Sequence, residues 1–217
     1  GDLTVTGGMS WTGGTLSGTG RTIIGTTGAL TMATTGSLSL NHTLENQGTA
    51  TWTSGTLSMS GGTLLNTGTF AANMSGSWVA QGVTIGATNQ FVNQGTFLKQ
   101  GSGTTSFASN SSGVAFNNDS SGTIQVDGGT LVFSSGGTHS GHIVVAAGTT
   151  LQVNSGSYTF ASASEASGAG AVQVTSGTLN VSGAARVQTL SLTGGAITGA
   201  GDLTVTGGMS WTGGTLS

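Results

Sequence analysis

Few side chains in this sequence have the chemistry that a catalytic site needs, and they are widely spaced. The six acidic residues are Asp2, Glu45, Asp119, Asp127, Glu165 and Asp202. Enzymes that cleave polysaccharides use two carboxyl groups held a few ångströms apart, and Asp119 with Asp127 is the closest approach to such a pair. Because the remaining carboxylates are scattered, we interpret both as isolated surface groups. We therefore expect no catalytic residue and no enzyme, with a polysaccharide-acting enzyme as the weakest of three alternatives.

Residues that could bind a metal ion or a cofactor are also few. The chain has no cysteine, which removes thiolate ligands and disulfides. His139 and His142 are three residues apart and could in principle bind a metal ion. On a β-strand, residues at that spacing face opposite sides. We interpret them as a polar turn and expect no metal site and no cofactor.

The charge balance argues against two classes of partner. The formal net charge is −3, and the only basic residues besides histidine are Arg21, Lys99 and Arg186. Nucleic acids are bound by clustered Lys and Arg, which these three positions do not provide. No run approaches ~18 consecutive apolar residues. We expect no nucleic-acid binding and no membrane insertion of this segment.

The composition favours an all-β fold. Charged residues make up only 4% of the chain and glycine accounts for 42 positions, whereas a typical soluble domain is ~25% charged. Apolar residues alternate with Thr or Ser in short bursts such as Leu57/Met59 and Leu131/Phe133, and turn residues come after each burst. Alternation with a period of two places one set of side chains on one face of a strand.

The segment Gly1–Ser17, GDLTVTGGMSWTGGTLS, returns letter for letter as Gly201–Ser217. The period is therefore 200 residues. We interpret residues 1–200 as one full repeat unit and residues 201–217 as the start of the next, identical unit. Since neither end carries a capping element, we expect both copies to take the same conformation, related by a translation of ~43 Å along a fibre axis and a rotation.

A shorter period runs inside the unit. Apolar residues recur every 19 to 22 positions in three interleaved columns, which indicates a chain that winds with three short strands per coil. The predicted fold is a parallel β-solenoid with about 20–27 residues per coil and about nine coils per unit. The columns are Leu3, Ile23, Leu44 and Leu64; Leu131, Leu151, Val172 and Leu192; and Leu16, Leu38, Leu57 and Trp78.

A second motif fixes the register of the coils. The sequence Asn-X-Gly-Thr comes after an apolar position three times, and a looser copy comes after Phe116. The spacing lengthens in the middle of the unit, so the stretches Gly82–Gln90 and Lys99–Gly113 are expected to form loops or bulges. We predict that stacked side-chain amides form a structural asparagine column, made of Asn46, Asn66, Asn93 and Asn118.

Exposed aromatic rings would favour a binding function. Trp52, Trp78 and Tyr158 are the candidate surface aromatics on which a sugar could stack. The alternation around Trp52 and Trp78 favours the core instead. Rows of outward Thr also occur on ice-binding solenoids, but here Thr is mixed with Ser, Gln and Asn, which makes that function the weaker interpretation.

Segments such as LENQGTATWTSGTLSMSGGT, FVNQGTFLKQGSGTT and LTGGAITGAGDLTVTG resemble the β-strand repeats of very large bacterial surface and secreted proteins. The sequence is similar to filamentous haemagglutinin-like adhesins and autotransporter passengers over nearly its whole length. The resemblance implies a right-handed parallel β-solenoid, an extracellular or cell-surface location and an adhesive or scaffold role. It implies no catalytic residue.

These observations predict the structural shaft of an extracellular fibre or giant surface protein, acting as a spacer, stalk or matrix filament. The expected partners are neighbouring repeat units, joined end to end covalently or by stacking, and other fibres or glycans. The alternative is an adhesin that binds glycans or host surfaces through the solenoid face or the mid-unit loops.

Overall fold

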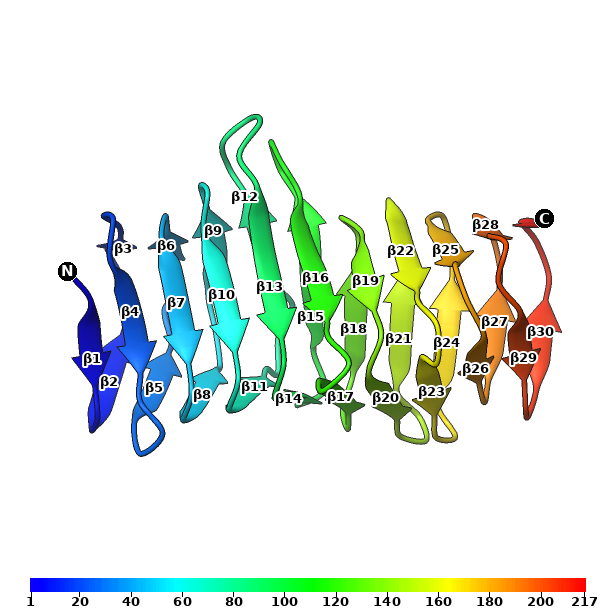
Figure 1. Cartoon of the computed structure of the whole chain (residues 1–217), viewed down its shortest axis with the longest axis horizontal. Helices are drawn as coiled ribbons and strands as arrows, with labels where there is room; N and C mark the ends of the chain where they lie inside the picture. Colours follow the sequence, from blue (N-terminus) through cyan, green and yellow to red (C-terminus); the bar gives the residue numbers. More distant parts are fainter.

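A computed structural model describes all residues from 1 to 217. The chain contains 31 β-strands and no helix. It winds as a β-solenoid whose coils succeed one another along the long axis, with the two termini at opposite ends (Figure 1). Every pairing between strands is parallel and joins strand n to strand n + 3, so the predicted all-β parallel solenoid is confirmed.

The strands form three sheets, which we call sheets A, B and C in the order in which each coil visits them. Sheet A contains β1 (Leu3–Val5), β4 (Arg21–Ile24), β7 (Thr43–Asn46), β10 (Thr63–Asn66), β13 (Asn89–Asn93), β16 (Val114–Asn118), β19 (Gly137–His139), β22 (Ser157–Phe160), β25 (Thr178–Val181), β28 (Ala196–Thr198) and β31 (Thr215–Leu216). Sheet B contains β2 (Gly8–Trp11), β5 (Ala29–Met32), β8 (Thr49–Trp52), β11 (Thr69–Asn73), β14 (Thr96–Gln100), β17 (Thr123–Val126), β20 (His142–Val145), β23 (Glu165–Ser167), β26 (Ala185–Val187) and β29 (Leu203–Val205). Sheet C contains β3 (Thr15–Leu16), β6 (Ser37–Leu40), β9 (Thr56–Met59), β12 (Trp78–Gly82), β15 (Thr104–Ser109), β18 (Thr130–Phe133), β21 (Thr150–Val153), β24 (Ala171–Val174), β27 (Leu190–Leu192) and β30 (Met209–Trp211).

Alternation within each strand builds the core. In β9, for example, Leu57 and Met59 are buried while Thr56 and Ser58 are half-buried on the outer face. The inward side chains of all three sheets join into one cluster of 41 buried residues that runs along the axis. Removing this apolar surface from water is the main term that stabilises the fold.

The middle of the core is aromatic. Phe91 stacks on Phe116 of the next coil with ring centroids 4.8 Å apart, and Phe133 stacks on Tyr158 at 4.4 Å. Phe107 meets Phe116 edge to face at 4.7 Å. Offset stacking and edge-to-face contacts are the arrangements that aromatic rings favour. The coils nearer the ends are filled by Leu, Met, Val and Trp instead.

Glycine is required at one corner because successive coils touch there. Gly48, Gly68 and Gly95 come just after the asparagine positions at the corner between sheets A and B. A Cβ atom on Gly68 would overlap the carbonyl oxygen of Gly48, and one on Gly95 would overlap that of Gly68. None of the three has a positive φ. At this corner glycine is needed for close backbone approach rather than for a left-handed conformation.

Two of the predicted columns contain errors of register. Leu3 pairs with Thr22, so the buried residues of β4 are Thr22 and Ile24, and Ile23 between them faces outward beside Glu45. In sheet C, Val172 pairs with Leu190, so Leu192 stacks on Val174.

The third column is wrong at both of its ends. Leu16 stacks on Leu40, while Leu38 stacks on Leu57 and then on Ala80. Trp78, the predicted last member, lies two residues earlier in β12 and pairs with Thr105.

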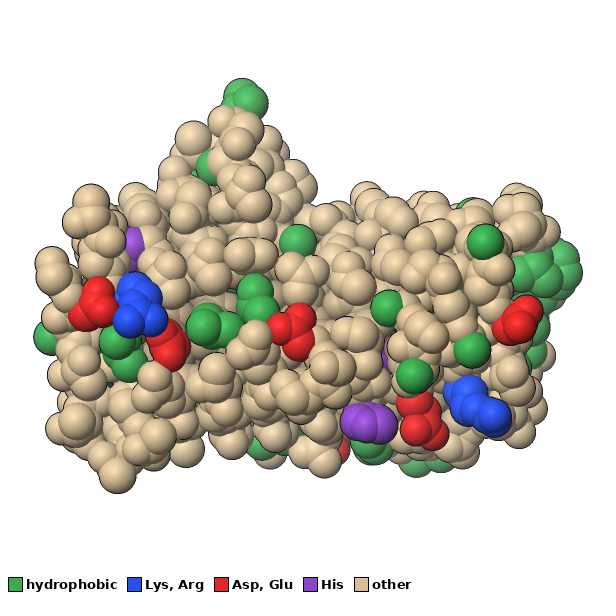
Figure 2. Space-filling model, in the orientation of Figure 1, with side chains coloured by type: hydrophobic (Ala, Val, Ile, Leu, Met, Phe, Trp, Pro, Cys, Tyr) green, Lys and Arg blue, Asp and Glu red, His purple; other side chains and the backbone are tan.

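Two loops of the long coils lie at the same corner. Residues 83–88 join β12 to β13 and residues 110–113 join β15 to β16, both between sheets C and A. Asn89 Nδ2 donates to Ser112 Oγ at 2.9 Å and links the two loops. They rise together as a knob on one side of the solenoid (Figure 2). The expectation that Lys99–Gly113 is a loop is wrong for most of that stretch, since β14 ends at Gln100 and β15 occupies Thr104–Ser109.

Candidate functional site

The two candidate catalytic carboxylates lie at different corners. Asp119 comes directly after β16 and Asp127 directly after β17, so the whole of β17 separates them. Asp119 accepts a hydrogen bond from Gln94 Nε2 at 2.9 Å, and Asp127 is exposed. This arrangement does not bring two carboxyl groups together around a shared reacting atom.

The two histidines of the candidate metal pair also separate. His139 is fully buried at the end of β19, whereas His142 is exposed at the start of β20. His142 Nδ1 lies 3.8 Å from Glu165 Oε2 on the next coil. No three His, Asp or Glu side chains are close enough together to hold a metal ion.

The four asparagines of the predicted column are in register on neighbouring strands of sheet A. Each side-chain Nδ2 donates to the Oδ1 of the next asparagine at 2.7 Å, from Asn46 to Asn66, Asn93 and Asn118. The second hydrogen of each amide reaches backbone carbonyls, as in the 3.0 Å bond from Asn66 to Thr96. All four side chains are buried. A continuous ladder of this kind satisfies polar groups that are costly to bury alone.

Sequence reasoning did not foresee that His139 continues this ladder. Asn118 Nδ2 lies 3.1 Å from His139 Nδ1, and His139 Nε2 lies 3.3 Å from the carbonyl oxygen of Glu165. Because Asn118 donates, His139 accepts at Nδ1 and carries its proton on Nε2. Burial lowers the pKa of His139 to about 4, so the ring is neutral at physiological pH. The sequence feature that could have placed His139 in the ladder is its spacing of 21 residues from Asn118.

The ladder stops where apolar residues take over the column. Asn46 pairs on its other side with Ile24, and its Oδ1 has no hydrogen-bond partner. Beyond His139 the column continues with Phe160, whose ring lies 4.9 Å from the imidazole. The polar column therefore belongs to the middle of the unit only.

Lys99 is a second buried titratable side chain that sequence reasoning missed. Its ammonium donates to three backbone carbonyls, those of Gln100 at 2.8 Å, Gly128 at 2.9 Å and Gly101 at 3.1 Å. Burial lowers its pKa to about 8. The sequence did contain a sign of this burial. Lys99 comes two residues after Phe97, so both side chains lie on the same face of β14, and Phe97 is buried. Lys99 therefore joins backbone carbonyl groups at one corner of the solenoid, and its side chain faces no open surface.

Two of the three candidate surface aromatics lie in the core, which corrects that prediction. Trp52 and Tyr158 are buried, and Trp52 Nε1 donates to the carbonyl oxygen of Gly55 at 3.0 Å. Burial raises the pKa of Tyr158, whose hydroxyl has no hydrogen-bond partner. Trp78 is partly buried against the core. The rings are inward because they occupy inward positions of alternating strands.

Most of the charged side chains form one row near each end of the solenoid (Figure 2). At the N-terminal end Arg21 sits between two carboxylates of adjacent coils, with N–O distances of 3.1 Å to Asp2 and 2.8 Å to Glu45. The Arg21 backbone N–H, which donates to Asp2 Oδ1 at 2.9 Å, and then the guanidinium lower the pKa of Asp2. The Asp2–Arg21 pair is exposed to solvent on both sides, and an exposed pair stabilises only slightly.

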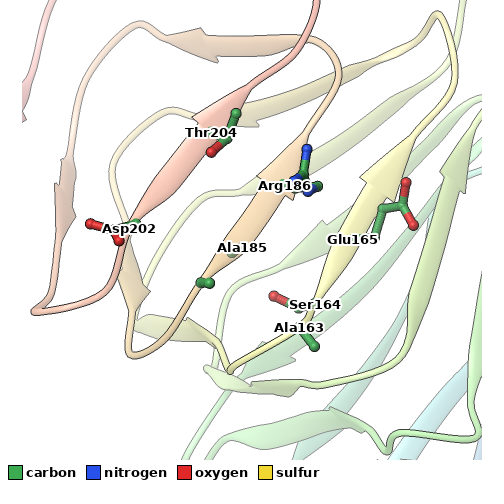
Figure 3. Close-up of a pocket in the computed structure, with 8 residues that line it drawn as sticks. Ala163, Ser164, Glu165, Ala185, Arg186, Asp202 and Thr204 are labelled. Atoms are coloured by element: carbon green, nitrogen blue, oxygen red, sulfur yellow. The ribbon is translucent and has the colours of Figure 1, made fainter.

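The second row borders a shallow hollow of about 400 Å³. Glu165, Arg186 and Thr204 occupy three successive strands, β23, β26 and β29, in one register (Figure 3). Asp202 lines the same hollow. The hollow exists because its floor has only small side chains, namely Ala163, Ser164, Ala184 and Ala185.

The largest exposed apolar side chains lie at the two ends and at the knob. Leu3 is exposed at the N-terminal end, and Met209, Trp211 and Leu216 are exposed at the C-terminal end. Ile85, 86% exposed, lies in the knob loop. The end residues all belong to the duplicated segment.

Identical residues therefore differ in burial. Trp11 is 4% exposed because Met32 of the following coil packs in register with it, whereas Trp211 has no following coil and is 55% exposed. The duplicated segment keeps its three-strand pattern in both copies. The difference lies in the next coil, which covers only the first copy.

No protein-family model matches this chain, and no curated protein or solved structure is found to be similar to it. No helix of a length and apolarity that could cross a membrane occurs in the structure.

Proposed function

We propose that this chain is part of the shaft of an extracellular fibre or giant surface protein, and that its role is mechanical, as a spacer, stalk or matrix filament. The observation that carries the proposal is the duplicated segment. After 200 residues the same seventeen residues return, and they form the next coil of one uninterrupted solenoid rather than the start of a separate domain. Neighbouring units are then joined through continuous sheets.

The charge distribution and the core support the same function. The exposed charges are few, and the buried polar groups are used for stacking coils rather than for contacting a ligand. Each unit contributes 28 strands, which is nine coils and one strand. At ~4.8 Å per coil, one unit lengthens the shaft by roughly 45 Å. The resemblance to bacterial surface and secreted repeat proteins supports an extracellular or cell-surface location.

The test compares one unit with two. A chain of residues 1–200 joined directly to residues 1–217 should be a rod longer than the 217-residue chain by roughly 45 Å, as measured by small-angle X-ray scattering and electron microscopy. A compact particle, or two separate bodies that reorient freely, would contradict the proposal.

One observation favours a second candidate function, adhesion through the mid-unit knob. Its tip presents Ile85 to solvent at 86% exposure, and Val83 beside it is 38% exposed. Exposed apolar side chains that lie together mark contact surfaces, and Val83 and Ile85 share this one loop. Binding of the 217-residue chain to host-cell surfaces or a glycan array, lost in Ile85→Ser with the fold intact, would support this function. Equal binding by both proteins would contradict it.

A further inference from the structure

The duplicated segment does not return to the same face of the solenoid. Its first copy places β1 in sheet A, β2 in sheet B and β3 in sheet C. Its second copy places β29 in sheet B, β30 in sheet C and β31 in sheet A. The shift arises because 28 strands precede β29, and 28 is not a multiple of three. Identical sequences thus occupy faces that differ by one sheet.

We propose that the next copy of this unit, which begins with residues 201–217, continues the solenoid in a register turned by one third of a turn, so that its second coil packs on the exposed C-terminal coil. The inference rests on the proposed shaft function and specifies how its units join. The first copy of the segment identifies the occupant, because it is covered by the second coil of its own unit. The next unit's β5 would lie on β30, and its Met32 would cover Trp211 as Met32 covers Trp11.

The N-terminal end fits the same arrangement. Within this chain, Leu203 pairs with Ala185, Val205 with Val187 and Trp211 with Leu192. A preceding unit would therefore place its Ala185 over Leu3, which is 54% exposed here. Each apolar side chain that an end leaves exposed has a defined partner in the adjoining copy.

Charge complementarity supports this register. Six of the nine Lys, Arg, Asp and Glu residues lie in the two end rows. In the first coils, Asp2, Arg21 and Glu45 lie at the sheet A face. In the last coils, Glu165 and Arg186 lie on sheet B.

The one-sheet shift brings the two rows onto a single face. Asp202 immediately precedes β29 in sheet B, so the next unit's Arg21 and Glu45 also fall on sheet B. The row along the axis then reads Glu165, Arg186, Asp202, next Arg21 and next Glu45, with alternating sign. Without the shift, Asp202 and the next unit's Arg21 and Glu45 would lie at sheet A instead. Opposite charges on neighbouring strands stabilise a sheet, whereas like charges destabilise it.

The register has a consequence for the knob. In the first unit the loop of residues 83–88 leaves the corner between sheets C and A. In the second unit the same loop would leave the corner between sheets A and B, and in the third the corner between B and C. Knobs would point in three directions in turn, roughly 45 Å apart along the shaft.

The register is tested by two distances in a chain of residues 1–200 joined directly to residues 1–217. Because the sequence has no cysteine, single cysteine pairs can be spin-labelled cleanly. One pair joins Ile85 to the second unit's copy of Ser75, and the other joins Ile85 to its own second copy. Ser75 is an exposed residue in the turn between β11 and β12. The shift places its second copy on the same corner as Ile85, nine coils or ~43 Å further along.

We expect the distance from Ile85 to the copy of Ser75 to be the shorter of the two by electron–electron double resonance. The reverse order would overturn the shifted register while leaving a rod of doubled length, and so the shaft, intact. A particle that does not lengthen in small-angle scattering would instead contradict the shaft itself.

A second measurement tests the charge row. Arg21→Gln in the second unit only should speed amide hydrogen exchange in β26 and β29 roughly fivefold, because Asp202 and the next Glu45 would lose the cation between them. The matched control is Arg21→Gln in the first unit only, which should leave exchange in β26 and β29 unchanged. Equal exchange in both variants would overturn the proposed junction.

Discussion

The middle of the unit and its two end coils use the same winding but hold it in different ways. In the middle, β7 to β22 enclose a stack of aromatic rings and a ladder of four asparagines and one histidine, all buried. At the ends, Leu, Met and Trp side chains remain exposed, and no ladder of buried side chains joins the coils. The middle is complete within one unit, whereas each end leaves apolar side chains uncovered, and we expect a neighbouring unit to cover them.

The comparison shows which parts of the sequence specify register. A column of identical amides can pair only with itself, so a slip by two residues, which keeps the same face of the strand inward, would bury unpaired donors and acceptors. Leu and Val tolerate such a slip better because any apolar side chain fills the space. We therefore expect the middle coils to set the register of the whole unit and the ends to adopt it.

The largest effect is expected from emptying the aromatic stack. Phe116 is fully buried and its ring contacts Phe91, Phe97, Phe107 and Phe133. Phe116→Ala should lower the free energy of unfolding of the middle coils by about 4 kcal/mol, measured by denaturant-dependent hydrogen exchange. Leu3→Ala, at a residue 54% exposed, is the control and should cost less than about 1 kcal/mol. Equal losses would mean that the middle is no better packed than the ends.

The next largest effect is expected from breaking the ladder in its centre. Asn93→Ala leaves Asn66 Nδ2 and Asn118 Oδ1 without their 2.7 Å partners, and buried unpaired polar groups cost about 1–3 kcal/mol each. We expect a loss of about 3 kcal/mol in chemical denaturation. Asn46→Ala is the matched control, because Asn46 Oδ1 already lacks a partner, and it should cost about half as much. A ladder that contributes nothing would give two equal and small losses.

The sequence was sufficient to predict the repeat, the three strands per coil and the asparagine column, because each leaves a periodic trace in residue type. The register of β4 was not predictable in this way. Thr22, Ile23 and Ile24 offer two neighbouring apolar candidates for one inward position. The choice is made by contacts between coils, since Thr22 Oγ1 bonds His42 Nε2 at 3.1 Å and Arg21 faces outward to reach Asp2.

The sequence also did not predict which polar side chains are buried. Tyr158 is buried without a partner for its hydroxyl, and Lys99 is buried with only carbonyls around it. Both depend on the shape of one corner or one layer of the core, which composition and period do not encode. The position of the second copy on a different sheet was missed because it depends on an exact strand count within the unit.

His139 should make the stability of the middle coils depend on pH in a way that the stability of the ends does not. Its pKa is about 4 in the folded chain and near 6.5 when unfolded, so the unfolded state takes up a proton first as the pH falls. Stability is then full above pH 6.5 and is lost between pH 6.5 and 4, by up to about 3 kcal/mol. Hydrogen exchange at β16, β19 and β22 should report this loss.

The matched control for that prediction is His139→Asn. An asparagine at this position has no titration between pH 4 and 6.5, and its amide can accept from Asn118 and so extend the ladder by one member. The variant should remove most of the dependence of stability on pH in that range. A dependence that persists unchanged in His139→Asn would show that His139 is not its source.

The smallest effect in the 217-residue chain is expected at the end coil, and it should grow when a neighbour is present. Trp211→Ala removes a side chain that is 55% exposed, so it should change the free energy of unfolding by less than about 1 kcal/mol. The identical change at Trp11, which is 4% exposed, should cost about 3 kcal/mol. In a chain of two joined units Trp211 gains the coil that Trp11 already has, and Trp211→Ala should then cost as much as Trp11→Ala does here. A Trp211 whose contribution stays small in the two-unit chain would show that the second copy is not covered as the first is. The difference between the ends and the middle would then belong to the fold itself rather than to the missing neighbour.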